Sequence, residues 1–131
     1  MIERTLIIRA DALEMIFSGT KDWEIRTRPT RIRGRIALSE KGANAIVGTC
    51  TLHDVKGPLS IEDVLKNARR MGNRAEILED VTWWRRQCRE GRVYAWVLRD
   101  VRRLRRPVRF ANPSGAVTWA RLPARIAHQL R

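Results

Sequence analysis

The sequence contains few of the residues that build disulfide scaffolds and metal sites. Its 131 residues include two cysteines, Cys50 and Cys88, and two histidines, His53 and His128. Two cysteines are too few for a disulfide scaffold, and these four residues lack the spacing of metal ligands. We therefore expect no metal and no cofactor, and we interpret both cysteines as small buried thiols.

Long hydrophobic runs are also missing. No apolar stretch approaches the ~18 residues that indicate a membrane-spanning helix. The segment Met1–Arg9 lacks the basic-then-apolar order of a secretory signal, so we expect a cytoplasmic protein with no membrane partner. No repeat or low-complexity linker divides the chain, and domains commonly have ~100–200 residues. We expect a single domain over residues 1–131.

Acidic residues are scarce in the last two-fifths of the chain. Residues 1–80 hold 14 basic and 12 acidic residues, whereas residues 81–131 hold 13 basic and 2 acidic ones. The formal net charge is +13 and the isoelectric point is near 11.5. A compositional bias explains part of the arginine content, but not the loss of acidic residues after Asp80. The charge therefore indicates an anionic partner, and a nucleic acid is favoured over a membrane surface.

Short apolar or alternating segments predict β-strands in the first half of the chain. They cover residues 5–8, 23–28, 35–39 and 45–52. A short helix is expected after the first strand, with Asp11 as its cap and Gly19 at its end. The dipeptide Gly57-Pro58 is expected to end the β pattern.

Helices are expected in the middle of the chain and strands again near its end. Ser60 and Asp63 have the spacing of a capping box, and a further helix is expected over about 75–89, which makes a helical insert of about 60–91. Strands follow at 93–98 and 116–122. This order predicts an α+β fold, in which a small bent sheet or barrel carries peripheral helices.

One run of mixed charge lies at the start of the predicted strand 23–28. It reads Gly-x-Lys-x-x-Glu-x-Arg, and its charged members are Lys21, Glu24 and Arg26. Glu24 and Arg26 are two residues apart on a strand and share a face, whereas Trp23 points to the core. Lys21, in the preceding turn, is close enough to fold over the same face. The three side chains form either a structural ion-pair network, which the spacing alone favours, or a polar pocket for a phosphate or carbonyl.

This run also resembles the signature of a known family. Followed by Gly34 and a strand that ends in Ser39, it is similar to the ASCH domain (activating signal cointegrator homology) of the PUA-like superfamily. The family's closing strands are similar to Tyr94–Leu98, Leu104, Pro107-Val108 and Gly115-x-x-x-Trp119. The resemblance spans about Thr5 to Leu122. It implies a small bent β-barrel of the PUA-like type, a cleft lined by the Lys/Glu/Arg motif, and an association with RNA or nucleotides.

The resemblance also implies an alternative, because family members differ in activity. Some prokaryotic members look like ribonucleases, and one branch hydrolyses the amide of N4-acetylcytidine with a Lys, a Thr three residues later, and a Glu. Lys21 matches the lysine, but Glu24 occupies the threonine position. A lysine base must be neutral, which Arg26 and Arg28 favour and Glu24 opposes. The alternative is a metal-independent hydrolase for RNA or modified nucleosides, with Lys21 and Glu24 as catalytic residues.

Arginines are concentrated after the predicted strand 93–98. They are Arg99, Arg102, Arg103, Arg105, Arg106 and Arg109, with Asp100 as the one acidic residue among them. Arginine pairs phosphates bidentately, although long basic stems also cover apolar surface while their charge stays in water. The leading hypothesis is therefore a module that binds RNA or another single-stranded nucleic acid.

The candidate binding residues fall into two groups. The first lies at or near the motif and comprises Lys21, Trp23, Glu24, Arg26, Arg28 and Ser39, and the second comprises Arg99, Arg102, Arg103, Arg105 and Arg106. We expect a groove at the motif to continue along the arginines as one docking track. A third hypothesis is a protein partner that docks on the insert 60–91.

Overall fold

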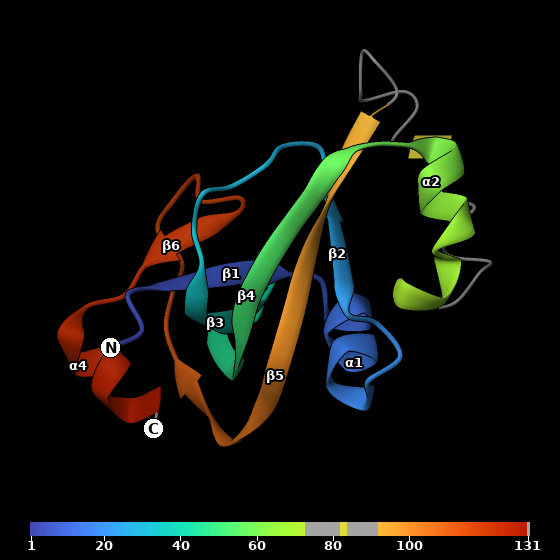
Figure 1. Cartoon of the computed structure of the whole chain (residues 1–131). Helices are drawn as coiled ribbons and strands as arrows, with labels where there is room; N and C mark the ends of the chain where they lie inside the picture. The colour runs from blue at the N-terminus through green and yellow to red at the C-terminus, as the bar shows by residue number, and fades with distance from the viewer. Residues whose placement is uncertain (73–81, 84–91, 131) are drawn as a thin grey trace.

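Six strands form one mixed sheet in the computed structural model, which describes residues 1–72, 82–83 and 92–130 (Figure 1). The strands are β1 (Arg4–Ile8), β2 (Trp23–Arg26), β3 (Gly34–Glu40), β4 (Ala45–Ser60), β5 (Arg92–Arg109) and β6 (Trp119–Arg121). Their order is β2-β5-β4-β3-β1-β6, and β1 and β3 are parallel whereas the other neighbours are antiparallel. Each strand expected in the sequence is present.

Short helices surround the sheet. They are the α-helices α1 (Ala10–Ser18), α2 (Ile61–Lys66) and α4 (Ala124–Ala127) and the 3-10 helices η1 (Ala68–Arg70) and η2 (His128–Leu130). Figure 1 shows α1 beside the lower end of β2, with α2 and α4 at opposite sides of the view. The second helix of the predicted insert, over about 75–89, lies almost wholly outside the described residues.

The C-terminal end of helix α1 agrees with the prediction, whereas its N-terminal cap does not. Gly19 ends it in the left-handed conformation at φ +83°, as predicted. The prediction that Asp11 caps the helix is wrong, because the helix begins at Ala10 and Arg9 occupies the cap position. Asp11 lies instead in the first turn, where its negative charge complements the helix dipole.

The predicted capping box of α2 is confirmed. The Ser60 hydroxyl accepts a 3.1 Å hydrogen bond from the Asp63 backbone N–H, and the Ser60 N–H donates one of 3.1 Å to the Asp63 carboxylate. The Ser60 hydroxyl also donates a 2.9 Å hydrogen bond to the Asp63 carboxylate, and the bonds that the Ser60 N–H and hydroxyl donate lower the pKa of Asp63.

The two central strands are longer than predicted. β4 continues through the cis peptide Gly57-Pro58 to Ser60, so the prediction that this dipeptide ends the strand is wrong. The pairing of β4 with β5 shifts in register between Lys56 and Leu59, and this shift accommodates Gly57-Pro58 within the strand. β5 itself spans 18 residues and includes the whole arginine-rich segment, because β4 continues to supply pairing partners beyond residue 98.

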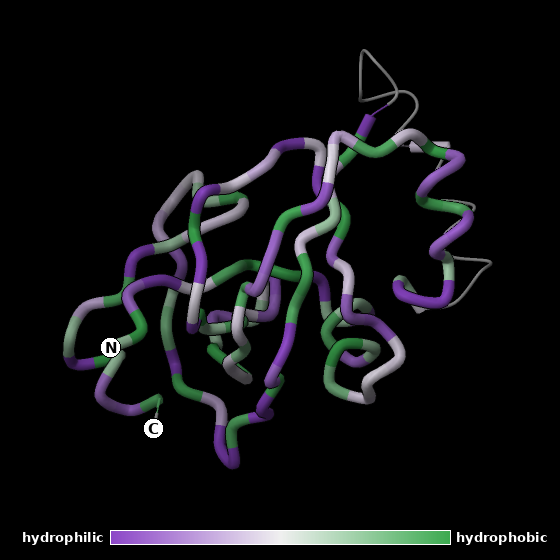
Figure 2. The backbone as a smooth tube through the Cα atoms, viewed as in Figure 1, coloured by the Kyte–Doolittle hydropathy of each residue, from purple (hydrophilic) through white to green (hydrophobic). Residues whose placement is uncertain are grey.

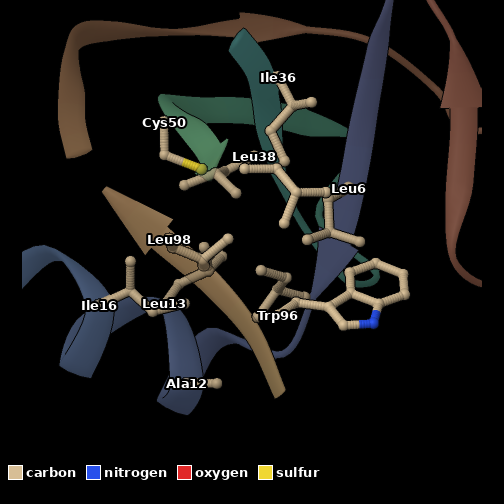
Figure 3. Close-up of a cluster of buried hydrophobic side chains, with 11 residues drawn as sticks. Leu6, Ala12, Leu13, Ile16, Ile36, Leu38, Cys50, Trp96 and Leu98 are labelled. Carbon is tan, nitrogen blue, oxygen red and sulfur yellow. The ribbon is translucent and has the colours of Figure 1, made fainter. Parts of the chain in front are cut away.

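The main hydrophobic core lies between one face of the curved sheet and α1 (Figure 3). Figure 3 shows Leu13 and Ile16 of α1 beside Leu98 of β5. The other buried members include Leu6, Ile8, Ile36, Leu38, Cys50, Leu52 and Trp96. We call this side of the sheet the core face. In Figure 2 the lower turn of β5 is mostly hydrophilic, and between its arginines Val101 packs against this core.

The opposite face of the sheet is covered by two smaller clusters. At one end Trp23 and Ile25 of β2 pack with Val93, Ala95 and Val97 of β5 and with Ile61 and Val64 of α2. At the other end Ala37 and Ile46 pack with Ile126 and Leu130 near the C-terminus. We call this side the outer face. Trp23 is buried as predicted, but in the smaller cluster with α2 on the outer face and not in the main core.

The sheet curls strongly but is not closed, so the α+β class is confirmed and the barrel is not. β2 and β6 are its edges and have four and three residues. Side chains span the opening between them. Arg26 of β2 donates a 3.0 Å hydrogen bond to the carbonyl oxygen of Ile7 in β1, and Trp96 stacks on Trp119 of β6 with ring centroids 5.7 Å apart.

Candidate nucleic-acid interface

Lys21, Glu24 and Arg26 meet at the start of β2, with the carboxylate between the two cations. Nζ of Lys21 lies 3.3 Å from Oε1 of Glu24, and Nη2 of Arg26 lies 3.4 Å from Oε2. Lys21 is 9% exposed and Glu24 is 8% exposed. Two cations around one buried carboxylate offset the cost of removing these charges from water. The motif is thus an ion-pair network, the arrangement that the spacing alone favoured.

The guanidinium of Arg26 is committed to the fold. Besides Glu24 and the Ile7 carbonyl, it lies over the ring of Trp96, 5.6 Å from the centroid. Trp96 is held in turn, since its Nε1 donates a 3.0 Å hydrogen bond to the carbonyl oxygen of Arg28. Glu24 pairs with Trp96 across the sheet, so the motif lies on the core face.

Two other predicted site residues are elsewhere. Trp23 is 7% exposed and lies in the cluster on the outer face. Ser39 is fully buried, and its hydroxyl lies 2.6 Å from that of Thr5. Ser39 shares the outer face with Ala37, two residues earlier in β3. The structure therefore brings neither Trp23 nor Ser39 together with the charged motif, whereas Arg28 is exposed close to it in the chain.

The six arginines between residues 99 and 109 of β5 are all exposed. One of them is paired: Nη2 of Arg103 lies 3.1 Å from Oε1 of Glu14, and its guanidinium lies 4.3 Å from the ring centroid of Phe17. Arg103 thereby fastens β5 to α1. Within the described residues, none of the others forms an ion pair. These five, which we call the arginine surface, are Arg99, Arg102, Arg105, Arg106 and Arg109.

The motif and the arginine surface adjoin along β5 but use different faces. The backbone N–H of Leu98 donates a 2.8 Å hydrogen bond to the carbonyl of Asp22, so the arginines begin beside the start of β2. Arg99 and Arg102 pair with Thr51 and Thr49, which alternate with core residues of β4. Arg99 and Arg102 therefore lie on the outer face. The predicted single track over the motif and these arginines is not supported.

A cation that the sequence analysis missed joins these arginines. Arg35 of β3 donates a 2.7 Å hydrogen bond to the carbonyl of Asp100 and one of 3.2 Å to the hydroxyl of Thr51. It also bonds the hydroxyl of Thr49. The sequence signal that could have found it was the alternation of arginines at 31, 33 and 35, which places three cations on one side of an extended segment.

The part of the chain that the structure describes contains neither a metal cluster nor a membrane-spanning helix. No three His, Cys, Asp or Glu side chains gather there in a way that would hold a metal ion. Among the same residues, no helix has the length and apolar character to cross a membrane.

Comparisons with known proteins agree with the resemblance seen in the sequence. No curated protein matches the chain. The crystal structure of ASCH from Zymomonas mobilis superimposes with a TM-score of 0.70 at 17% identity, over 96% of this chain and 91% of that one. Two point mutants of ZmASCH from the same organism give TM-scores of 0.68 at 18% identity, over 96% of this chain and 92% and 94% of theirs. At these identities the similarity shows the fold alone.

The family itself follows from the sequence match. The family model described as the ASCH domain matches residues 6–107, which include the charged motif and most of the arginine segment. ASCH domains are generally thought to bind RNA. This chain belongs to the ASCH domain family.

Proposed function

We propose that this ASCH domain binds single-stranded RNA through the arginine surface of β5. The observation that carries the proposal is the set of five exposed guanidinium groups without a carboxylate partner in the described residues. Such groups repel one another on a free surface, and a polyanion relieves this repulsion while it releases its own counterions. The five cations follow one strand, with side chains that alternate between its two faces, and a flexible single phosphate backbone can contact both.

The ion-paired motif supports this surface from the core face. β2 pairs with β5 immediately before the arginines, from Trp23 opposite Val97 to Arg26 opposite Tyr94. Fixing β2 therefore fixes the part of β5 from which the arginine surface extends. We assign the motif this positioning role in RNA binding.

Hydrolysis is less well supported by the same contacts. A catalytic lysine must reach its substrate, whereas Nζ of Lys21 lies 3.3 Å from the Glu24 carboxylate and the residue is only 9% exposed. The catalytic roles of Lys21 and Glu24 remain predictions from the family resemblance. Incubating wild type and Lys21→Ala with RNA, DNA and acylated cytidine tests them, since equal turnover by both proteins removes Lys21 from any mechanism.

A charge-matched comparison of variants tests the binding proposal. The test variant carries Arg102→Gln, Arg105→Gln and Arg106→Gln, and the control carries Arg31→Gln, Arg69→Gln and Arg125→Gln, which are exposed positions outside the surface. Both lose three positive charges. Binding of a short fluorescein-labelled single-stranded RNA is followed by anisotropy at low salt.

The proposal predicts different results for the two variants. The test variant is expected to bind about 10-fold more weakly or worse, because it loses three phosphate contacts, whereas the control changes little. Equal losses in both variants would show that net charge alone attracts RNA. That result, or a wild type that fails to bind at low salt, would contradict the proposal.

A further inference from the structure

A hollow outside both the motif and the arginine surface lies between the beginnings of β1 and β3. Its volume is about 460 Å³, and its lining includes the apolar side chains of Ile2, Ile32 and Ile36 and the cations Arg4, Arg33 and Arg35. Pockets of ≈ 300–1,000 Å³ that combine apolar walls with a few polar groups commonly bind small molecules. The hollow therefore has the size and the mixed lining of a ligand site.

Two of its guanidinium groups are held in place by the fold. Arg33 donates 2.8 Å hydrogen bonds from Nη1 to the carbonyl oxygens of Thr30 and Ile32. Arg35 is fixed by Thr49, Thr51 and the Asp100 carbonyl. A guanidinium carries several N–H donors, so Arg33 keeps donors for a ligand while its position is set in advance. The guanidinium of Arg35 is bonded to β4 and β5 and adds positive charge beside the hollow. Preorganisation of this kind lowers the cost of ordering side chains upon binding.

The charge of the lining favours a doubly charged anion. The three arginines contribute +3, and Glu3 is the one acidic side chain of the lining. Glu3 faces Arg4 at 3.8 Å and its side chain is 79% exposed, so this ion pair is weak. The net positive charge around the hollow attracts a phosphomonoester, which carries about −1.5 to −2 at pH 7, more strongly than a singly charged anion. An internal phosphodiester, with a single negative charge, is attracted less strongly.

We propose that this hollow binds a terminal nucleotide phosphate, either of a free nucleoside monophosphate or of the 5′-phosphorylated end of an RNA strand. The guanidinium groups of Arg4 and Arg33 hold the phosphate, and the partly exposed side chains of Ile2 and Ile32 contact the ribose or base. The RNA-end form rests on the proposed function, whereas the free-nucleotide form does not.

The register of the sheet links the hollow to the arginine surface. Arg35 of β3 is opposite Thr51 of β4, which is opposite Arg99 of β5. These three residues form one row across the outer face. Strands are ~4.8 Å apart, so the backbones of Arg35 and Arg99 are separated by about 10 Å. An RNA strand whose 5′ end occupies the hollow can therefore continue along the arginine surface.

Calorimetric titration with AMP, adenosine and inorganic phosphate tests the site without RNA. AMP is expected to bind at least about 10-fold more tightly than adenosine, because adenosine lacks the charge-assisted hydrogen bonds. Arg33→Gln is expected to weaken AMP binding by a similar factor. Arg4→Gln repeats the test, because it removes a cation without breaking the hydrogen bonds of Arg33 to Thr30 and Ile32. Arg31→Gln, a neighbouring exposed arginine outside the lining, is the control and is expected to bind AMP as wild type does. Equal binding of AMP and adenosine, or equal effects of Arg33→Gln and Arg31→Gln, would overturn the proposal.

A second titration distinguishes the two sources of the phosphate. The same RNA is compared with a 5′-phosphate and with a 5′-hydroxyl. A gain from the phosphate that Arg33→Gln abolishes and Arg31→Gln preserves assigns the hollow to RNA ends. AMP binding without such a gain assigns it to a free nucleotide.

The two proposals can fail separately. If RNA binds but neither AMP nor the 5′-phosphate depends on Arg33, the phosphate site is refuted and the proposed function stands. If AMP binding depends on Arg33 but no RNA binds, the proposed function is refuted and the phosphate site stands.

Discussion

The guanidinium of Arg26 donates a 3.0 Å hydrogen bond to the carbonyl oxygen of Ile7, and this contact joins β2 to β1 across the opening of the sheet. The same nitrogen lies 3.4 Å from the Glu24 carboxylate. Side chains therefore make the connection that strand pairing makes in a closed barrel. The charged motif that first suggested a ligand pocket is, in this structure, part of what holds the sheet in its curled form.

Replacing Arg26 tests this structural role. Arg26→Gln removes the contacts with Glu24 and Trp96 and weakens the bond to Ile7, so we expect the free energy of unfolding to fall by about 2 kcal/mol. Urea denaturation followed by tryptophan fluorescence measures the change. Arg28→Gln, an exposed neighbour with the same change of charge, is expected to have little effect. Equal stability of the two variants would show that Arg26 does not join the strands.

Replacing Gly48 tests how closely α1 packs against β4 and β5. A Cβ at this position would lie 2.5 Å from Cε1 of Phe17 and 2.7 Å from the carbonyl oxygen of Arg102. Gly48→Ala is therefore expected to lower the free energy of unfolding by about 1–3 kcal/mol, the usual cost of overpacking. Adding Phe17→Leu should restore only part of this loss, because the backbone oxygen cannot move as a side chain does. An unchanged melting temperature for Gly48→Ala would contradict this packing.

Cys50 is expected to be chemically inert in the folded protein. Burial raises the pKa of its thiol to about 12, with Arg35 acting weakly in the opposite direction. A Cys88→Ser variant leaves Cys50 as the single thiol, which should not react with Ellman's reagent at pH 8 until denaturant is added. Because the folded thiol holds its proton more tightly than the unfolded one, its contribution to stability should decline as the pH rises above 9.0, its ordinary pKa. Rapid reaction of the native variant would show that the site is open.

The contribution of Asp63 to stability depends on pH in the opposite direction to that of Cys50. Its hydrogen bonds with Ser60 lower its pKa, so it stabilises the fold above its ordinary pKa of 3.8 and loses this effect as the pH falls through the lower folded value. Asp63→Ala should therefore lower the urea midpoint at pH 7, and its difference from wild type should shrink in acid. A difference that stays constant between pH 7 and pH 3 would exclude the carboxylate as the cause.

The sequence predicted correctly those elements that depend on interactions between residues close together in the chain. The strand at 5–8, the glycine that ends α1 and the capping box of Ser60 and Asp63 depend on residues within a few positions of one another. The shared face of Glu24 and Arg26 also follows from the period of a strand.

Features set by pairing between distant segments were not predictable in this way. β4 passes through Gly57-Pro58 because β5 continues to pair with it, and which face of β5 carries Arg99 depends on the register with Thr51. Arg35 was missed because its partners lie 14 to 65 positions further along the chain. The assignment of Ser39 to the motif failed for the same reason, since only the parallel pairing of β1 with β3 reveals its contact with Thr5.

The salt dependence of RNA binding tests the central claim most directly. If the arginine surface binds about four to six phosphates, the logarithm of the association constant should fall against the logarithm of salt concentration with a slope near −3 to −4, as expected for single strands. Removing Arg102, Arg105 and Arg106 should make that slope shallower by about 2, whereas the control at positions 31, 69 and 125 should keep it. A flat wild-type curve, or a test variant with the wild-type slope, would contradict RNA binding at the arginine surface.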